Sequence, residues 1–92
     1  MTLNENPAER AKLYIQSFDS ALQKNRILTV DSVVKSSNIM RVSDAIERYV
    51  RDARYYLENQ KPTTSLVSIA YAEGLLDALM YLELTKGLEE SL

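Results

Sequence analysis

A chain of 92 residues, 46% hydrophobic and 26% charged, is too short to divide its apolar side chains between two cores, so we expect one domain over residues 1–92 with short tails. The complete absence of cysteine and histidine excludes disulfides, thiol and Ser-His catalysis, and zinc-finger sites. The 11 basic and 13 acidic residues give a net charge of −2, which provides no field to attract nucleic acid.

The chain also carries no clear targeting signal. Its first residues lack the apolar segment of a secretory signal, and a small domain without disulfides suits the cytoplasm. Residues 66–84 are apolar enough to consider as a membrane span, but Glu73, Asp77 and Glu83 would each cost about 2.5–3.5 kcal/mol near a bilayer centre. We therefore expect a cytoplasmic protein that binds neither membranes nor nucleic acid.

The first helix is expected over residues 7–24. Asn6 can cap it, Pro7 suits its first turn, and Glu9 stands where it completes a capping box. Apolar residues then recur at helical spacing within an arc of about 120°. They are Ala11, Tyr14, Ile15, Phe18, Ala21 and Leu22. This helix should bury one face and expose the other.

A second helix is expected over residues 38–59. Its apolar face consists of Ile39, Val42, Ile46, Tyr49, Val50, Ala53, Tyr56 and Leu57. Residues 29–34 can form a short helical turn. Its apolar side chains would point about 140° away from the apolar face of the helix that follows. We therefore place a break at residues 36–38, where serine and asparagine side chains compete with helical hydrogen bonds.

The third helix is expected over residues 64–86. Pro62 stops the preceding helix, Thr63 or Thr64 can cap the new one, and Gly87 can end it. Its core face consists of Ile69, Ala72, Leu76, Leu79 and Met80. The fold class is therefore all-α, an antiparallel three-helix bundle with little or no strand.

A second apolar stripe runs along nearly the opposite side of the third helix. It consists of Tyr71, Leu75, Ala78 and Leu82. Two explanations stay open: residues 30–34 fold over this stripe, or a protein partner or second copy contacts it. Gly74 nearby would let another helix approach closely. We assign the stripe as the expected interaction surface.

The segments YVRDARYYL (residues 49–57) and AYAEGLLDAL (residues 70–79) resemble the archaeal family known as domain of unknown function 357. The resemblance covers roughly residues 44–82, and the N-terminal third matches only in helical character. It implies a three-helix bundle of archaeal, cytosolic origin. Some members are fused to a nucleotidyltransferase-like domain, and the resemblance implies no established activity.

A possible polar site involves Asp52, Glu73 and Asp77, with Arg48 nearby. Glu73 and Asp77 are one helical turn apart and repel each other slightly, so a binding partner or a pairing residue is expected to compensate the repulsion. Together with Asp52 they can hold a hard cation such as Mg²⁺. The other interpretation is that Arg41 or Arg48 and nearby tyrosine hydroxyls pair with these carboxylates at a helix seam.

Arginines also line the second helix, with acidic residues between them. Arg41, Arg48, Arg51 and Arg54 alternate with Asp44, Glu47, Asp52 and Glu58. Spacing of four residues between opposite charges predicts a salt-bridged, solvated face rather than a phosphate site. Among the tyrosines, the positions of Tyr14, Tyr49 and Tyr56 predict core residues, and those of Tyr55 and Tyr71 predict surface residues.

These patterns favour a non-catalytic protein-interaction or accessory module. The partner would be a second copy, a separate protein or a fused domain. The alternative is a small-ligand or divalent-metal-binding protein, or a small enzyme, that uses Asp52, Glu73 and Asp77. No residue is assigned as catalytic, and no cofactor is expected.

Overall fold

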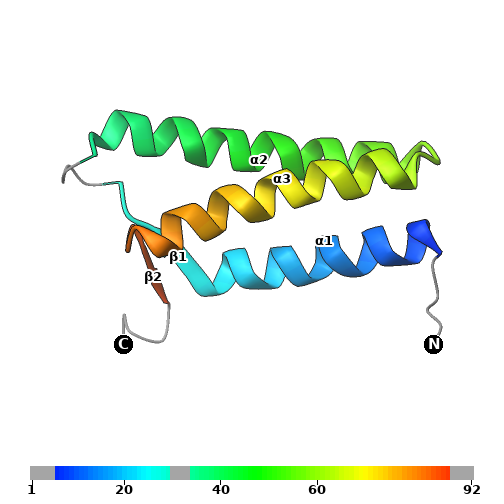
Figure 1. Cartoon of the computed structure of the whole chain (residues 1–92), viewed down its shortest axis with the longest axis horizontal. Coiled ribbons are helices and arrows are strands. Elements are labelled where there is room, and N and C mark those ends of the chain that lie inside the picture. The colour runs from blue at the N-terminus through cyan, green and yellow to red at the C-terminus, as the bar shows by residue number, and fades with distance from the viewer. Residues whose placement is uncertain (1–5, 30–33, 88–92) are drawn as a thin grey trace.

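Three helices and a short two-stranded ribbon make up the computed structural model, which describes residues 6–29 and 34–87. The elements are α1 (Pro7–Lys24), β1 (Asn25–Ile27), α2 (Ser36–Glu58), α3 (Pro62–Tyr81) and β2 (Thr85–Gly87). Consecutive helices run in opposite directions, so that α1 and α3 point the same way (Figure 1). The expected helical bundle is confirmed.

The two ends of α1 lie where the sequence predicts them. The Asn6 side chain accepts hydrogen bonds from the backbone N–H groups of Ala8 and Glu9, at 3.0 and 3.2 Å. These bonds satisfy donors that the first turn of any helix leaves without an intrahelical partner. Pro7 occupies the first helical position, where its missing N–H costs nothing.

The other two helices each begin two residues earlier than expected. Helix α2 begins at Ser36, inside the expected break, and α3 begins at Pro62. The expected cap at Thr63 or Thr64 is wrong, because Lys61 is the capping position and makes no side-chain capping bond. Proline suits the first turn of a helix and therefore opens α3 instead of merely preceding it.

The core lies where α3 packs against both α1 and α2. Its buried members are Ile15, Phe18, Ile39, Ile46, Val50, Ala53, Ile69, Ala72, Leu76, Leu79 and Leu84. Ser65 is fully buried beside them, and its hydroxyl donates to the backbone carbonyl of Ala53 at 2.7 Å. This bond joins α2 to α3 near their turn and compensates the burial of a polar atom.

Two residues expected in the core are instead exposed. Tyr14 and Met80 each keep 42% of their accessible surface. Both lie at the margin of an apolar arc, and three helices do not cover the full width of every arc. The Tyr14 hydroxyl accepts a hydrogen bond from the Arg10 guanidinium at 3.3 Å, on the solvent side of α1.

The end of α3 departs most from the sequence prediction, which extended the helix to Lys86. Helix α3 ends at Tyr81, and Glu83 adopts a left-handed backbone with φ of 58°. The Leu84 N–H then donates to the Leu79 carbonyl at 2.8 Å, and the Glu83 N–H donates to the Met80 carbonyl at 2.9 Å. This pair of bonds is a Schellman motif. Glu83 occupies the position where glycine is usual in such a turn, so the sequence pattern does not predict the turn.

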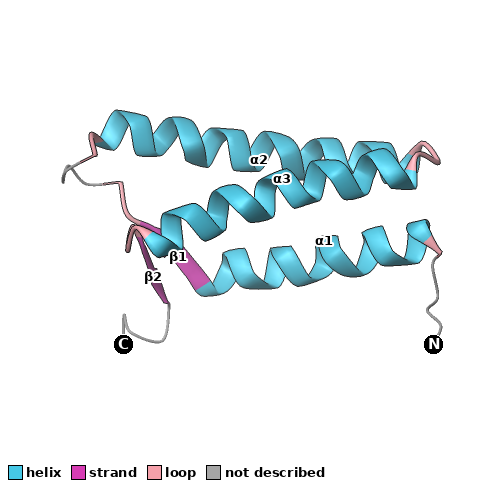
Figure 2. Ribbon diagram, in the orientation of Figure 1, coloured by secondary structure: helices cyan, strands magenta, loops and turns pink. Residues whose placement is uncertain are grey.

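Beyond this turn the chain forms a short strand; the strand content stays small, as expected, but the sequence pattern does not predict this pairing. Strand β2 pairs antiparallel with β1, with Ile27 opposite Thr85 (Figure 2). The Leu28 N–H extends the ladder with a 2.7 Å bond to the Leu84 carbonyl. Leu84 itself is buried against the core. The ribbon thus ties the ends of α1 and α3 together.

Residues 30–34 are one of the two expected covers of the second apolar stripe of α3. Residues 30–33, and with them most of the expected helical turn, lie outside the described residues. Val34 is half-buried and packs against the core cluster. Among the helices of the described ranges, none is long and apolar enough to cross a membrane.

We predict that Phe18→Ala destabilises the domain by about 3–5 kcal/mol, because truncating a buried aromatic side chain leaves a cavity. Phe18 is 3% exposed and contributes from α1 to the core. Urea unfolding followed by circular dichroism measures the change. An unfolding midpoint close to that of the wild type would show that α1 is not docked against the other two helices.

Candidate functional site

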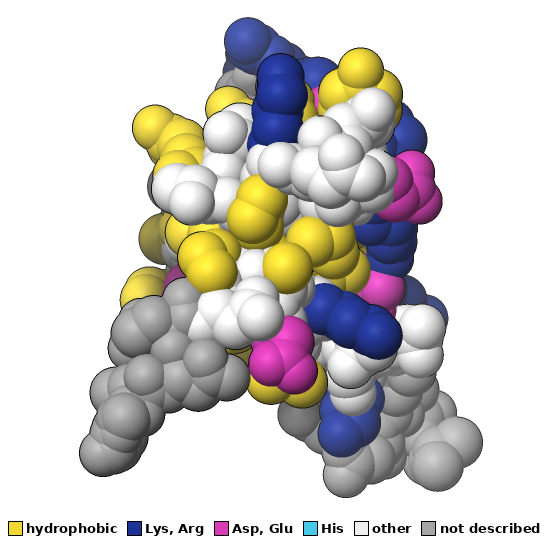
Figure 3. Space-filling view, turned by 90° about the vertical axis from the view of Figure 1, so that its right-hand side faces the viewer, with side chains coloured by type: hydrophobic (Ala, Val, Ile, Leu, Met, Phe, Trp, Pro, Cys, Tyr) yellow, Lys and Arg dark blue, Asp and Glu magenta, His cyan; other side chains and the backbone are white. Residues whose placement is uncertain are grey.

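The side of α3 that faces away from the core is apolar and exposed. We call it the outer face of α3; it consists of Val67, Ala70, Tyr71, Gly74, Ala78 and Tyr81 of the helix and Leu82 directly after it, all exposed. The large side chains keep much of their surface: Val67 52%, Tyr71 58%, Leu82 60% and Tyr81 82%. Hydrophobic side chains also gather at the centre of the bundle end where α2 turns into α3 (Figure 3).

The predicted stripe lies within and beside this face. Tyr71, Ala78 and Leu82 are exposed, whereas Leu75 is half-buried and packs against the core. The sequence interpretation missed Val67 and Tyr81. Val67 precedes Tyr71 by four residues, and this spacing on a helix was the available signal.

The Tyr71 ring stacks on the Tyr49 ring of α2, with centroids 5.2 Å apart and planes 16° apart. Tyr49 is half-buried and packs against the core cluster, as the sequence predicts. Stacking of this kind holds a ring in one orientation. Tyr71 therefore contributes a fixed, exposed aromatic surface to the outer face of α3.

Gly74 lies near the middle of this face, and the described residues give no reason for a glycine there. It is exposed and part of α3. A Cβ added at Gly74 would meet no atom of the described residues within 4 Å outside its own stretch of helix. Glycine inside a helix costs about 0.5–1 kcal/mol relative to alanine. The fold itself thus loses stability by keeping glycine at this position.

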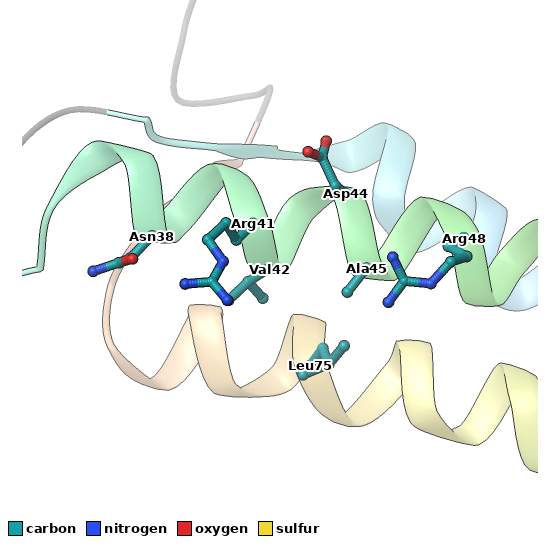
Figure 4. Close-up of a pocket in the computed structure, with 7 residues that line it drawn as sticks. All are labelled: Asn38, Arg41, Val42, Asp44, Ala45, Arg48 and Leu75. Atoms are coloured by element: carbon teal, nitrogen blue, oxygen red, sulfur yellow. The ribbon is translucent and has the colours of Figure 1, made fainter.

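An open groove of about 650 Å³ borders the outer face where α2 and α3 meet. Its lining residues are Asn38, Arg41, Val42, Asp44, Ala45, Arg48 and Leu75. The Arg41 and Arg48 side chains extend from α2 on the side of α3, with Leu75 opposite them, whereas Asp44 points away (Figure 4). Two cationic groups therefore stand over an apolar floor.

The charged face predicted for α2 is solvent-exposed as expected, but the salt bridges predicted along it are not formed among the described residues. In the part of the chain that the structure describes, Arg54 pairs with Asp19 of α1, and no ion pair involves Arg41, Arg48 or Arg51. The Arg48 guanidinium instead lies 5.6 Å from the centroid of the Tyr49 ring. Exposed pairs along one helix are worth only a few tenths of a kcal/mol, so solvated side chains readily separate.

The residues of the predicted polar site do not gather together. Asp52 is half-buried on α2, while Glu73 and Asp77 are exposed on α3. Within residues 6–29 and 34–87, no three acidic side chains lie close enough to hold a metal ion. Among the same residues, the three carboxylates form no hydrogen bond or ion pair with Arg41, Arg48 or a tyrosine. Of the four residues of the predicted polar site, only Arg48 lines the groove.

Glu73 and Asp77 lie on the opposite edge of the outer face from the groove. Each follows a groove-side residue, Tyr71 or Leu75, by two positions, which places it about 160° away around α3. The outer face therefore has a basic edge, formed by Arg41 and Arg48 of α2, and an acidic edge, formed by Glu73 and Asp77.

Comparison with known proteins identifies the family. Residues 13–85 match the family model described as protein of unknown function (DUF357). The match covers most of α1, all of α2 and α3, and β1. No curated protein and no solved structure matches the chain.

We predict that Gly74→Ala stabilises the isolated chain by about 0.5–1 kcal/mol, because alanine favours helix and its Cβ meets open space. Chemical unfolding at low protein concentration measures this change. Destabilisation would show that another part of the chain contacts this point of α3.

Proposed function

The chain belongs to the DUF357 family, whose description names no activity, and we propose that it is a non-catalytic interaction module that pairs with a second copy of itself through the outer face of α3. The observation that carries this proposal is the row of exposed apolar side chains along one helix, with four large members. Contiguous apolar patches of this kind mark interaction sites on soluble proteins.

Burial of this face would favour association. Full burial of one large apolar side chain contributes about 1.5–3 kcal/mol. Four such side chains lie along the outer face, and Tyr71 is already held in place by its stacking on Tyr49. An ordered side chain loses little conformational entropy on binding, so more of its burial energy appears as affinity.

A second copy suits this face because of the charges at its edges. The basic edge and the acidic edge have no ionic partners among the described residues. A surface that carries both signs is complementary to itself, and complementary charges favour one partner over others. Gly74 also supports a second copy as the partner. The described residues do not require glycine at this position, and a glycine lets another backbone approach closely.

The alternative function, a ligand or metal site built from Asp52, Glu73 and Asp77, has less support because no three acidic side chains of the described residues come close enough to hold a metal ion. The proposed module would act in the cytoplasm of an archaeal cell, as the family resemblance implies. A fused domain, such as the nucleotidyltransferase-like domain of some relatives, would then be brought into pairs by the module.

We expect Ala78→Lys together with Leu82→Lys to raise the dissociation constant of the dimer about 100-fold or more, since two charges would be forced into an apolar contact. Both side chains are exposed, so the helical content should not change. Light scattering after size-exclusion chromatography measures the mass, and circular dichroism measures the helix.

The matched control is Leu13→Lys together with Met40→Lys, which places the same charges on exposed apolar positions of α1 and α2. This control should stay dimeric. If the double variant in α3 loses helix, Val67→Lys replaces it at the other end of the same face. A wild-type chain that is monomeric at every concentration would overturn the proposal.

A further inference from the structure

The basic edge and the acidic edge lie at matching levels along α3. Tyr49 stacks on Tyr71, and α2 runs antiparallel to α3. A residue that precedes Tyr49 in α2 by a given number of positions therefore lies at about the height of the residue that follows Tyr71 in α3 by the same number. This places Arg48 at about the level of residue 72 and Arg41 at about the level of residue 79.

The carboxylates of the acidic edge lie close to the same two levels. With a rise of 1.5 Å per residue, Glu73 is about 1.5 Å from the level of Arg48, and Asp77 is about 3 Å from the level of Arg41. The two edges thus carry opposite charges at equal heights on either side of one apolar face. None of the four residues has an ionic partner in the described chain.

We infer that two copies pack α3 against α3 in parallel, about a two-fold axis that runs along the helices, and that salt bridges close both sides of the contact. Arg48 pairs with the partner's Glu73, and Arg41 pairs with the partner's Asp77. This inference rests on the proposed function and adds the geometry and the partner residues.

The orientation follows from symmetry. A two-fold axis along α3 exchanges left and right but keeps height, so the basic edge of one copy meets the acidic edge of the other. A two-fold axis across α3 makes the helices antiparallel and brings each edge against its own counterpart. Arginines would then face arginines, and such like-charge contacts disfavour an interface.

The shape of the face fits the parallel arrangement. Gly74 lies between the levels of the two arginines, and its neighbours Ala70 and Ala78 on the same face are small. Close approach of two backbones at Gly74 brings the α2 edge of each copy within reach of the partner's α3. Leu75 lines the groove beneath the arginines and meets the rim of the contact.

Charge reversal tests the pairing. Arg41→Glu with Arg48→Glu makes both edges acidic, and Glu73→Arg with Asp77→Arg makes both edges basic. Each double variant alone should dimerise about tenfold more weakly or worse at low salt. An equal mixture of the two should recover the mass and affinity of the wild-type dimer, because opposite edges meet again.

Lys12→Glu with Arg51→Glu is the matched control, since it changes the net charge by the same amount as the first variant at exposed positions of α1 and α2. It should dimerise as the wild type does. Added salt should weaken the wild-type dimer, because it screens attractive pairs. Reversal variants that dimerise like the wild type would overturn the inferred pairing.

Single cysteines test the direction of the helices, because the chain contains no cysteine and any disulfide must join two copies. Disulfides need Cα atoms within about 7 Å. In the parallel dimer, Ala70→Cys and Ala78→Cys should each form a disulfide with itself under oxidation. An antiparallel dimer centred on Gly74 would form the disulfide only when the two variants are mixed, and this result would overturn the inference.

The outcomes separate this inference from the proposed function. If the lysine variant in the outer face dissociates the dimer but charge reversal and cysteine pairing do not behave as described, the interaction module stands and its geometry is wrong. If the wild-type chain is monomeric, both fail together.

Discussion

The whole molecule depends on α3, because one side of this helix supplies the wall against which both other helices pack. Ile69, Ala72, Leu76 and Leu79 are buried there, and the fully buried Ser65 adds a hydrogen bond to the backbone of α2. A domain of this size needs most of its apolar side chains for its core. An additional apolar side on the same helix is therefore a property that folding alone does not require.

The position of α3 is set at both ends by turns that contain no glycine. Gln60, after α2, and Glu83, after α3, both adopt left-handed backbones. Each turn closes with the paired backbone bonds of a Schellman motif, in the first case from Lys61 to Tyr56 and from Gln60 to Leu57. A left-handed residue other than glycine costs about 1–2 kcal/mol. Burial of Leu84 against the core offsets part of that cost at the second turn.

The same geometry explains why charged residues end at the borders of an apolar face. Antiparallel packing of α2 on α3, held in register by the stacked Tyr49 and Tyr71 rings, brings Arg41 and Arg48 beside Leu75. The helical spacing of α3 by itself places Glu73 and Asp77 on the opposite edge of the outer face. The result is a face with opposite charges along its two edges, which neither helix would present by itself.

The sequence by itself determined the three helices, the start of α1 and most of the core, because apolar side chains that recur every three or four residues can be buried only on one side of a helix. It also identified Tyr71, Ala78 and Leu82, since they follow the same spacing on the opposite side. It did not determine the end of α3 or the ribbon, because Glu83 carries no local signal for a left-handed turn and strand pairing joins residues far apart in the chain. Only the tertiary structure decided that Tyr14 and Met80 remain exposed, that Asp52 does not join Glu73 and Asp77 in a metal-binding cluster of the described residues, and that two arginines border the outer face. Those properties depend on which helix lies beside which, and spacing within one helix cannot specify its neighbours.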